Sequence, residues 1–308
     1  MNRCPISYEM CQDQKYAIAG LKLLSPKLLA LQDFYYTAKE QRELALTQMS
    51  KISIQGIQPK FSTRLNVSEG QFEVVERDGS FIFKPPHYLF AELPQNEDLT
   101  MRLAKLMGLE VPTHGLIYNR DSSLTYFIRR FDRLTLGRKR ACEDFSQLMQ
   151  YSRDTKYESS IEKMIPVIEQ HCTFPLLEKM KFFRLVLFNF LIGNEDAHLK
   201  NFSLIQRDNI VELSPAYDLV NSTIVIKAQE ELALPLHGKK RNITRQDLLV
   251  YFGKERLGLS DKFVEEELSL FKKTIPYWFE LIPQSFLSQE HQEKYAGVIE
   301  ERCKRIGF

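Results

Sequence analysis

The strongest periodic pattern in the chain lies between residues 175 and 192, where apolar side chains recur every three or four positions. The positions that would share one face of an α-helix are Leu176, Met180, Phe183, Leu187 and Phe190. A proline at position 175 suits the first turn of such a helix. The most apolar part, 182–192, is too short to cross a bilayer and includes Arg184 and Asn189. The pattern therefore predicts an apolar helix that does not span a membrane.

From about residue 51 to residue 133 the pattern mixes short β-like runs with a single helix. We expect strands over residues 80–84, 115–118 and 124–129. Asn96 can cap the helix, and Gly108 and Pro112 can end it. The apolar positions of this helix are Leu99, Leu103 and Leu106.

After residue 133 the pattern is mostly helical. A β-hairpin is expected over residues 201–213, with its turn at Arg207 and Asp208. Further helices are expected to start at Arg245 and at Asp261.

A β-rich first part followed by a helical second part predicts an α+β fold with two lobes, the layout of protein kinases. We place an N-lobe at residues 1–130 and a C-lobe at residues 131–308. The N-lobe would hold a phosphate-covering loop, the strand that ends at Lys84 and a regulatory helix. With 308 residues, 44% of them hydrophobic, the chain is large enough to build a real core.

Charge and cysteine content restrict the partners and the setting. The 42 basic and 40 acidic residues leave a net charge of +2, too small to draw the chain to nucleic acid or to an anionic membrane. Five scattered cysteines argue against a disulfide framework and a zinc site, and fit a reducing compartment. Residues 1–5 lack the apolar core of a signal peptide. We expect a soluble, cytoplasmic protein without membrane contact or direct contact with nucleic acid.

The candidate chemistry lies in the polar loop, residues 193–202, directly after the long apolar helix. This loop carries Asp196 and Asn201, five positions apart, and Asp218 follows seventeen positions later. A protein-kinase catalytic loop needs an acid that orients the attacking hydroxyl and accepts its proton. An amide and a second acid hold Mg²⁺ against the nucleotide phosphates. The spacing thus predicts phosphoryl transfer from ATP, with Asp196 as base and Asn201 and Asp218 as metal ligands.

Lys84, at the end of a predicted strand, is a candidate for binding the α- and β-phosphates. Glu97, in the first turn of the following helix, is our candidate for the carboxylate that orients it, and Glu92 is the competitor. A single strand-end lysine is more often a surface charge, but the acids and the amide of the polar loop favour a functional role. A glycine-rich phosphate motif is missing, and residues 51–61 with the single Gly56 stand in its place.

Other residues of the polar loop have competing interpretations. Asn194 suits a turn. His198 could be a metal ligand, a base or a packing residue, and the lack of a second histidine at ligand spacing argues against a transition-metal site. Lys200 could neutralise charge on the transferred phosphoryl group or lie on the surface. Glu195 points elsewhere if Asp196 points inward, so it receives no role.

The chain resembles the HipA family of bacterial toxin serine/threonine kinases, from about residue 4 to residue 222. Several ordered blocks carry the resemblance: 52–60, 83–85, 93–97, 130–133, 156–158, 193–202 and 215–218. Ordered blocks at suitable spacing are far more specific than any one motif. The resemblance implies catalytic roles for Asp196 and Lys84, and metal binding by Asn201 and Asp218.

The resemblance also implies the extent of the ATP site. Residues 55–60 would cover the phosphates, and the hinge at 129–131 would hold the adenine. The expected ATP-binding residues are Gln55, Gly56, Ile57, Gln58, Pro59, Lys60, Lys84, Arg129, Arg130, Phe131, His198, Leu199, Lys200, Asn201, Tyr217 and Asp218. In this family a serine at the Ser53 position is autophosphorylated, and the modification expels the loop from the ATP site and silences the enzyme.

Within the family the chain is most similar to the short HipT-type toxins, because HipA itself has an additional N-terminal subdomain before the matching region. Some of these toxins have a second serine where this chain has Gln55, so we expect control through Ser53 alone. The resemblance implies two partners: a small antitoxin similar to the missing subdomain and a helix-turn-helix HipB-like protein. It implies an aminoacyl-tRNA synthetase as substrate, whose phosphorylation would inhibit translation and produce growth arrest or persistence.

Three other functions stay open on the sequence. One is a small-molecule kinase of the same fold, since antibiotic and lipid kinases share the Asp-x-x-x-x-Asn spacing. Another is a catalytically silent kinase fold that acts as an antitoxin or scaffold, which the intact lysine, acids and amide argue against. The third is a DNA-bound regulator, which the near-neutral charge disfavours.

Overall fold

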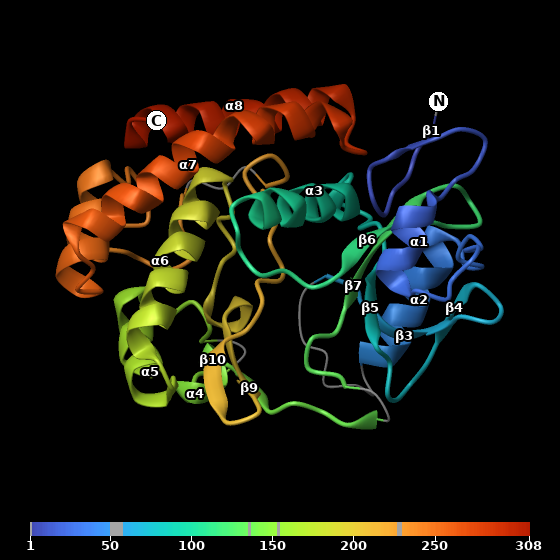
Figure 1. Cartoon of the computed structure of the whole chain (residues 1–308), viewed down its shortest axis with the longest axis horizontal. Helices are drawn as coiled ribbons and strands as arrows, with labels where there is room; N and C mark the ends of the chain where they lie inside the picture. Colours follow the sequence, from blue (N-terminus) through green and yellow to red (C-terminus); the bar gives the residue numbers. More distant parts are fainter. Residues whose placement is uncertain (1, 50–57, 135–136, 153–154, 227–229) are drawn as a thin grey trace. The chain divides into compact units, whose positions relative to one another are not determined.

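The computed structural model describes residues 2–49, 58–134, 137–152, 155–226 and 230–308. The chain forms two compact units, which Figure 1 traces in sequence colours. The first unit comprises Met1–Leu99, Pro112–Arg138 and Gln284–Leu287. The second unit comprises Thr100–Val111, Lys139–Pro283 and Ser288–Phe308.

The first unit is built on a five-stranded antiparallel sheet with the strand order β4-β3-β5-β7-β6. Its strands are β3 (Phe61–Asn66), β4 (Gln71–Val74), β5 (Phe81–Lys84), β6 (His114–Tyr118) and β7 (Leu124–Arg129). The elements before the sheet are the hairpin of β1 (Asn2–Arg3) and β2 (Met10–Cys11), and the helices α1 (Ile18–Leu24) and α2 (Ala38–Met49). The three strands expected from the pattern are therefore confirmed, each within one residue.

Aromatic side chains form the core on one face of this sheet. The buried phenylalanines of this cluster are Phe34, Phe61, Phe72, Phe81, Phe83 and Phe127, and α1 adds Leu21 and Leu24. Successive side chains of a strand point to opposite faces. Because Phe81 and Phe83 face the core cluster, Lys84 of the same strand points to the other face.

The helix α3 (Leu93–Leu106) starts three residues before the expected cap at Asn96. Leu93 is its first residue and Pro94, which fits a first helical turn, is its second. The expected start is therefore wrong, and Asn96 is buried within the helix. Glu97 consequently lies in the second turn. Gly108 adopts a left-handed φ of 74° just after the helix, as its predicted role in ending it requires.

The second unit contains a three-stranded antiparallel sheet with the order β10-β9-β8. Its strands are β8 (Cys142–Asp144), β9 (Ser203–Arg207) and β10 (Ile210–Leu213). The predicted hairpin is confirmed in β9 and β10, with Asp208 at a left-handed φ of 55° in its turn. The pattern did not predict β8, which is too short to show a periodicity.

Helices form the rest of the second unit. They are α4 (Phe145–Leu148), η2 (Glu162–Met164), α5 (Ile165–His171), α6 (Pro175–Leu191), η3 (Leu199–Asn201), the π-helix η4 (Gln246–Arg256), α7 (Asp261–Leu281), η5 (Ile282–Gln284), which extends one residue beyond the unit, and α8 (Gln289–Ile306). Figure 1 shows α7 and α8 beside α6. None of the helices in the described ranges is both long and apolar enough to span a membrane.

The predicted apolar helix is α6. Of the positions expected to share one face, Phe183, Leu187 and Phe190 are buried, whereas Leu176 in the first turn is 57% exposed. On another side of the helix, Phe188 contacts Trp278 of α7 edge to face, with ring centroids 5.5 Å apart. The last turn of α6 is thus fixed by its neighbours, and this turn leads directly into the polar loop.

Candidate active site

In the first unit, Lys84 and Glu97 form a buried ion pair. The Nζ atom of Lys84 lies 2.6 Å from Oε1 of Glu97, and the two side chains are 5% and 0% exposed. Lys84 ends β5 opposite Tyr126 of β7, and its ammonium lies 5.6 Å from the centre of the Tyr126 ring. The sheet and α3 thereby hold a lysine and a carboxylate in the relation expected from the sequence.

The predicted adenine hinge follows β7 in the same unit. Arg129 packs its guanidinium over the Phe81 ring, 4.8 Å from the ring centre, and donates to the carbonyl of Leu24. Its side chain therefore lies on the core face, opposite to Lys84, because Phe81 belongs to the core cluster. The expected contact of residue 129 with the adenine stays a prediction. Arg130 makes a two-pronged ion pair with Asp132, at 3.0 and 2.8 Å.

Part of the predicted phosphate-covering loop can be placed. Gln58, Pro59 and Lys60 lead directly into β3, and Pro59 is buried. Ser53, Gln55, Gly56 and Ile57 lie outside the described residues. The predictions for autophosphorylation and for the tip of this loop therefore stay predictions.

The polar loop of the second unit begins with two residues that turn the chain away from α6. Gly193 has a φ of 74°, and a side chain there would approach Oγ1 of Thr223 to 2.6 Å. Asn194 is buried, donates to the side chain of Asn189 at 2.9 Å and accepts from the backbone N–H of Asp196 at 3.3 Å. Asn194 is therefore a turn residue, as its type suggests.

Glu195 has a role that the sequence analysis missed. Its Oε1 atom accepts hydrogen bonds from Arg302 of α8 at 3.1 Å and from Thr223 at 2.9 Å. The side chains of Glu195 and Arg302 are only 6% and 5% exposed. Burial raises the pKa of the Glu195 carboxyl, whereas Arg302 and Thr223 act in the opposite direction. The sequence offered no local sign of this ion pair, because Arg302 lies 107 positions away from Glu195.

Asp196, the predicted base, is exposed. Its Oδ1 atom accepts a hydrogen bond of 2.5 Å from the hydroxyl of Tyr157. The Tyr157 ring stands edge-on to the ring of His198, with centroids 5.0 Å apart. Lys156 completes the group, because its Nζ atom lies 2.5 Å from Nε2 of His198.

His198 is a structural centre of the polar loop. It is 6% exposed and caps η3, where its Nδ1 accepts from the backbone N–H of Lys200 at 3.2 Å. The pKa of His198 is lowered to about 4, mainly by burial and in addition by Lys156, while Asp196 and Asp218 oppose the shift. The imidazole is therefore neutral at pH 7, and a packing and capping role fits it better than a charged one.

Asn201 and Asp218 lie side by side. The Nδ2 atom of Asn201 is 3.5 Å from Oδ2 of Asp218, and its Oδ1 accepts from the backbone N–H of His198 at 3.0 Å. Asp218 has a left-handed φ of 54°, an uncommon conformation that Asp tolerates better than most residues. The described residues contain no cluster of three or more His, Cys, Asp or Glu that could hold a metal. Two oxygen-bearing side chains would still suit Mg²⁺ at a nucleotide site. There the phosphates and water supply most of the ligands, and the protein supplies few.

Two other predicted ATP-binding residues support the loop. Tyr217 donates to the carbonyl of Lys200 at 2.8 Å and contacts the hydroxyl of Ser203 at 2.6 Å. Leu199 is fully buried. Both side chains hold η3 in place, and through it Asn201.

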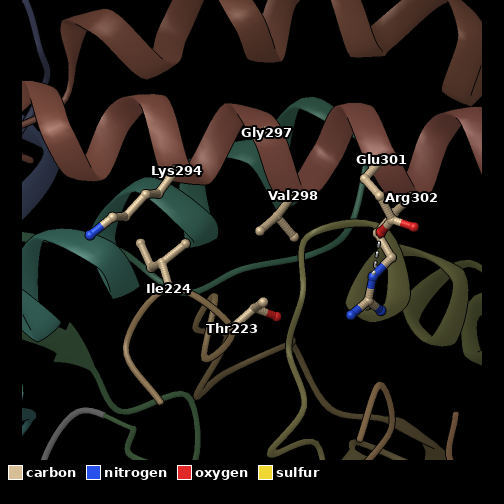
Figure 2. A pocket seen from close by; sticks show the side chains of 7 residues that line it. All are labelled: Thr223, Ile224, Lys294, Gly297, Val298, Glu301 and Arg302. Carbon is tan, nitrogen blue, oxygen red and sulfur yellow. Dashed lines mark ion pairs between the residues drawn. The ribbon is translucent and has the colours of Figure 1, made fainter. Parts of the chain in front are cut away.

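A pocket of about 420 Å³ lies between α8 and the segment that follows Asp218. Figure 2 shows Thr223 and Ile224 facing Gly297 and Val298 of α8, with the Glu301–Arg302 ion pair at one end and Lys294 at the other. The pocket reaches the polar loop through two of its lining residues, since Thr223 and Arg302 both bind Glu195.

Comparison with known proteins places these features in a family. The sequence model of the HipA-like C-terminal domain matches residues 52–278. A Haemophilus influenzae protein named as a candidate kinase is 30% identical, over 91% of this chain and 84% of that protein. The serine/threonine-protein kinase toxin HipA of Shewanella oneidensis is 27% identical, over 73% of this chain. The alignment with that toxin spans 56% of its length.

Solved structures show the same fold. A chain from the Shewanella oneidensis complex of HipA, HipB and operator DNA matches with a TM-score of 0.69 and 23% identity, over 91% of this chain and 74% of that chain. The Helicobacter pylori proinflammatory kinase CtkA matches with a TM-score of 0.54 and 17% identity, over 73% of this chain and 87% of that chain. The predicted α+β, kinase-like fold is confirmed.

Proposed function

This chain belongs to the family of HipA-like C-terminal domains, and from that premise we propose that it is an ATP-dependent serine/threonine protein kinase. The observation that carries the proposal is the pairing of Asn201 with Asp218 in the second unit, in one loop system with the exposed Asp196. Base, amide and second acid are the side chains that phosphoryl transfer requires of this part of a kinase.

Asp196 is the proposed catalytic base. Its exposed carboxylate would hold the substrate's hydroxyl in line with the γ-phosphate and accept its proton. Asn201 and Asp218 would bind Mg²⁺ through an amide oxygen and a carboxylate oxygen. Bound there, Mg²⁺ would offset the charge that spreads onto the γ-phosphate oxygens. The amide oxygen of Asn201 already accepts one hydrogen bond, from His198, which fixes its orientation.

Lys84 is the proposed ligand of the α- and β-phosphates. Its partner Glu97 is buried, so the ion pair restricts the Lys84 ammonium to one position, whereas the side chain of a surface lysine is flexible. Glu97 would hold the ammonium of Lys84 in one position for contact with the phosphates, which supports the role that the family resemblance assigns to Lys84.

The central test is phosphate incorporation. We expect wild-type protein incubated with Mg²⁺ and ATP to gain one phosphate on Ser53, measured by intact-mass and peptide mass spectrometry. Asp196→Asn is expected to lower the rate by at least about 10²-fold, because positioned base catalysis contributes that much. Asp208→Asn is the matched control, since Asp208 is an exposed turn residue of the same unit.

The outcomes separate the alternatives. Phosphate gained by Asp196→Asn at the wild-type rate would contradict the role of Asp196. No phosphate on any protein, including added lysate proteins, would favour a silent scaffold. Phosphorylation of small metabolites alone would favour a small-molecule kinase.

We propose that phosphate on Ser53 is the off-switch. It would bring about −1.5 to −2 charges to the segment proposed to cover the phosphates of ATP. Ser53→Asp is therefore expected to bind ATP more weakly than Ser53→Ala, as measured by titration calorimetry. Equal affinities would contradict this switch.

The biological role proposed for the kinase is that of a toxin in a toxin–antitoxin system, of the short HipT type. An aminoacyl-tRNA synthetase is the proposed substrate, and inhibition of translation the consequence. The Shewanella structure contains HipB, which supports a HipB-like partner for this chain. The small antitoxin similar to the HipA N-terminal subdomain rests on the family resemblance alone.

A further inference from the structure

The turn at residues 155–158 contacts the polar loop at two adjacent points. Tyr157 donates to Asp196 at 2.5 Å, and Lys156 lies 2.5 Å from Nε2 of His198. The backbone N–H of Glu158 closes this turn on the carbonyl of Thr155, at 2.9 Å. All of these residues belong to the second unit. Two consecutive side chains thus hold two residues of the polar loop.

The phenol of Tyr157 is itself held in place. Tyr157 is 36% exposed, and its ring packs edge-on against His198, while the ammonium of Lys156 lies 4.8 Å from the ring centre. Burial raises the pKa of Tyr157, and the negative charge of Asp196 raises it further, so the hydroxyl keeps its proton and remains a donor.

This contact solves a problem that an exposed base would otherwise have. The side chain of a surface aspartate can turn among several rotamers, and only some of them would face a substrate hydroxyl. The hydrogen bond from Tyr157 fixes one carboxylate oxygen, Oδ1, and thereby the direction of the other, Oδ2.

We propose that Tyr157 is a positioning residue for phosphoryl transfer, which holds Asp196 by Oδ1 and leaves Oδ2 to accept the proton of the substrate's hydroxyl. This inference rests on the proposed function of Asp196. In the step, the hydroxyl oxygen forms a bond to the γ-phosphorus of ATP, and its proton passes to Asp196. The bond between the γ-phosphorus and the bridging oxygen breaks, and ADP leaves with the electron pair.

The test compares Tyr157→Phe with wild type in single-turnover autophosphorylation with Mg-ATP, followed by intact-mass spectrometry. We expect the rate at saturating ATP to fall roughly 10- to 100-fold, the range in which misplaced catalytic groups act. The ATP concentration for half-maximal rate is expected to change by less than about twofold, and the melting temperature to stay the same. Tyr151→Phe, which removes a nearby phenol from the same segment, is the matched control.

A second comparison shows whether Tyr157 acts through Asp196. If it does, Tyr157→Phe has no further effect in an Asp196→Asn background, because the two changes remove one function. A further fall in that background, or an unchanged or raised rate in Tyr157→Phe alone, overturns the inference. Either result leaves the proposed function intact, provided that Asp196→Asn alone is at least about 10²-fold slower than wild type. Full activity of Asp196→Asn would instead contradict the proposed function itself.

Discussion

Neighbouring residues of the polar loop face entirely different surroundings. Glu195 is buried and bound to Arg302, whereas Asp196 is exposed and bound to Tyr157. His198, two positions further, is buried again. Because buried and exposed residues alternate, Glu195 and His198 anchor the loop in the protein while the carboxylate of Asp196 remains exposed.

The buried His198 predicts a specific loss of stability in acid. Its pKa is lowered from the usual 6.5 to about 4, so the unfolded chain takes up a proton at a higher pH than the folded chain. The free energy of unfolding therefore falls as the pH drops from about 6.5 to about 4. Between pH 7 and pH 5 this one residue should account for about 2 kcal/mol.

Urea unfolding at pH 7 and pH 5 measures this loss. His198→Gln should lose about 2 kcal/mol less than wild type between the two pH values. His171→Gln, at an exposed position, is the control and should follow wild type. Equal losses in wild type and His198→Gln would show that the histidine is protonated in the folded protein.

At the scale of elements, α8 is the support of the polar loop. Arg302 binds Glu195 and also donates to the carbonyl of Phe190, at 3.2 Å, in the last turn of α6. One guanidinium of α8 therefore joins the end of α6 to the start of the polar loop. The pocket in Figure 2 lies along the same helix.

Removing this guanidinium should be costly. Arg302→Met would leave the carboxylate of Glu195 buried without its ion partner, which typically lowers the free energy of unfolding by about 3–5 kcal/mol. The double variant Glu195→Gln with Arg302→Met should recover part of this loss, because no buried charge remains. Chemical denaturation measures both.

Arg305→Met is the matched control on the same helix. Arg305 pairs with Glu231 and Glu301 but is 28% exposed, so its loss should be smaller. A loss for Arg305→Met as large as that for Arg302→Met would show that α8 is stabilised generally, and not through Glu195.

Local patterns predicted the elements well where the signal was local. The helix α6 and the hairpin of β9 and β10 were found because their periodicity and turn residues lie within one segment. The start of α3 was placed too late because Asn96, a good cap by type, is instead buried inside the helix. Tertiary packing around Asn96 thus overrides the local preference of asparagine for a helix cap.

The candidate site shows the same division. Lys84, Asp196, Asn201 and Asp218 could be named because kinase chemistry requires those residue types at those spacings. The contacts of Arg302 and Tyr157 with the polar loop could not be predicted, because both residues lie in distant segments. The block at 156–158 contributed to the family resemblance but did not indicate a role for Tyr157.

At the scale of the whole molecule, the family match and the support of the site cover different stretches. The match to the HipA-like C-terminal domain ends at residue 278, in α7. Arg302 lies beyond that limit, yet it binds a residue next to the proposed base. The residues that hold the polar loop in place therefore extend beyond the end of the matched domain.

The long separation between Glu195 and Arg302 has a consequence in time. A ribosome adds about 5–20 residues per second, so the 107 positions between the two residues correspond to roughly 5 to 20 s. During that interval a newly made chain holds the whole polar loop but lacks the guanidinium that binds it. The carboxylate of Glu195 would thus lack its ion partner in the nascent protein until α8 has been synthesised.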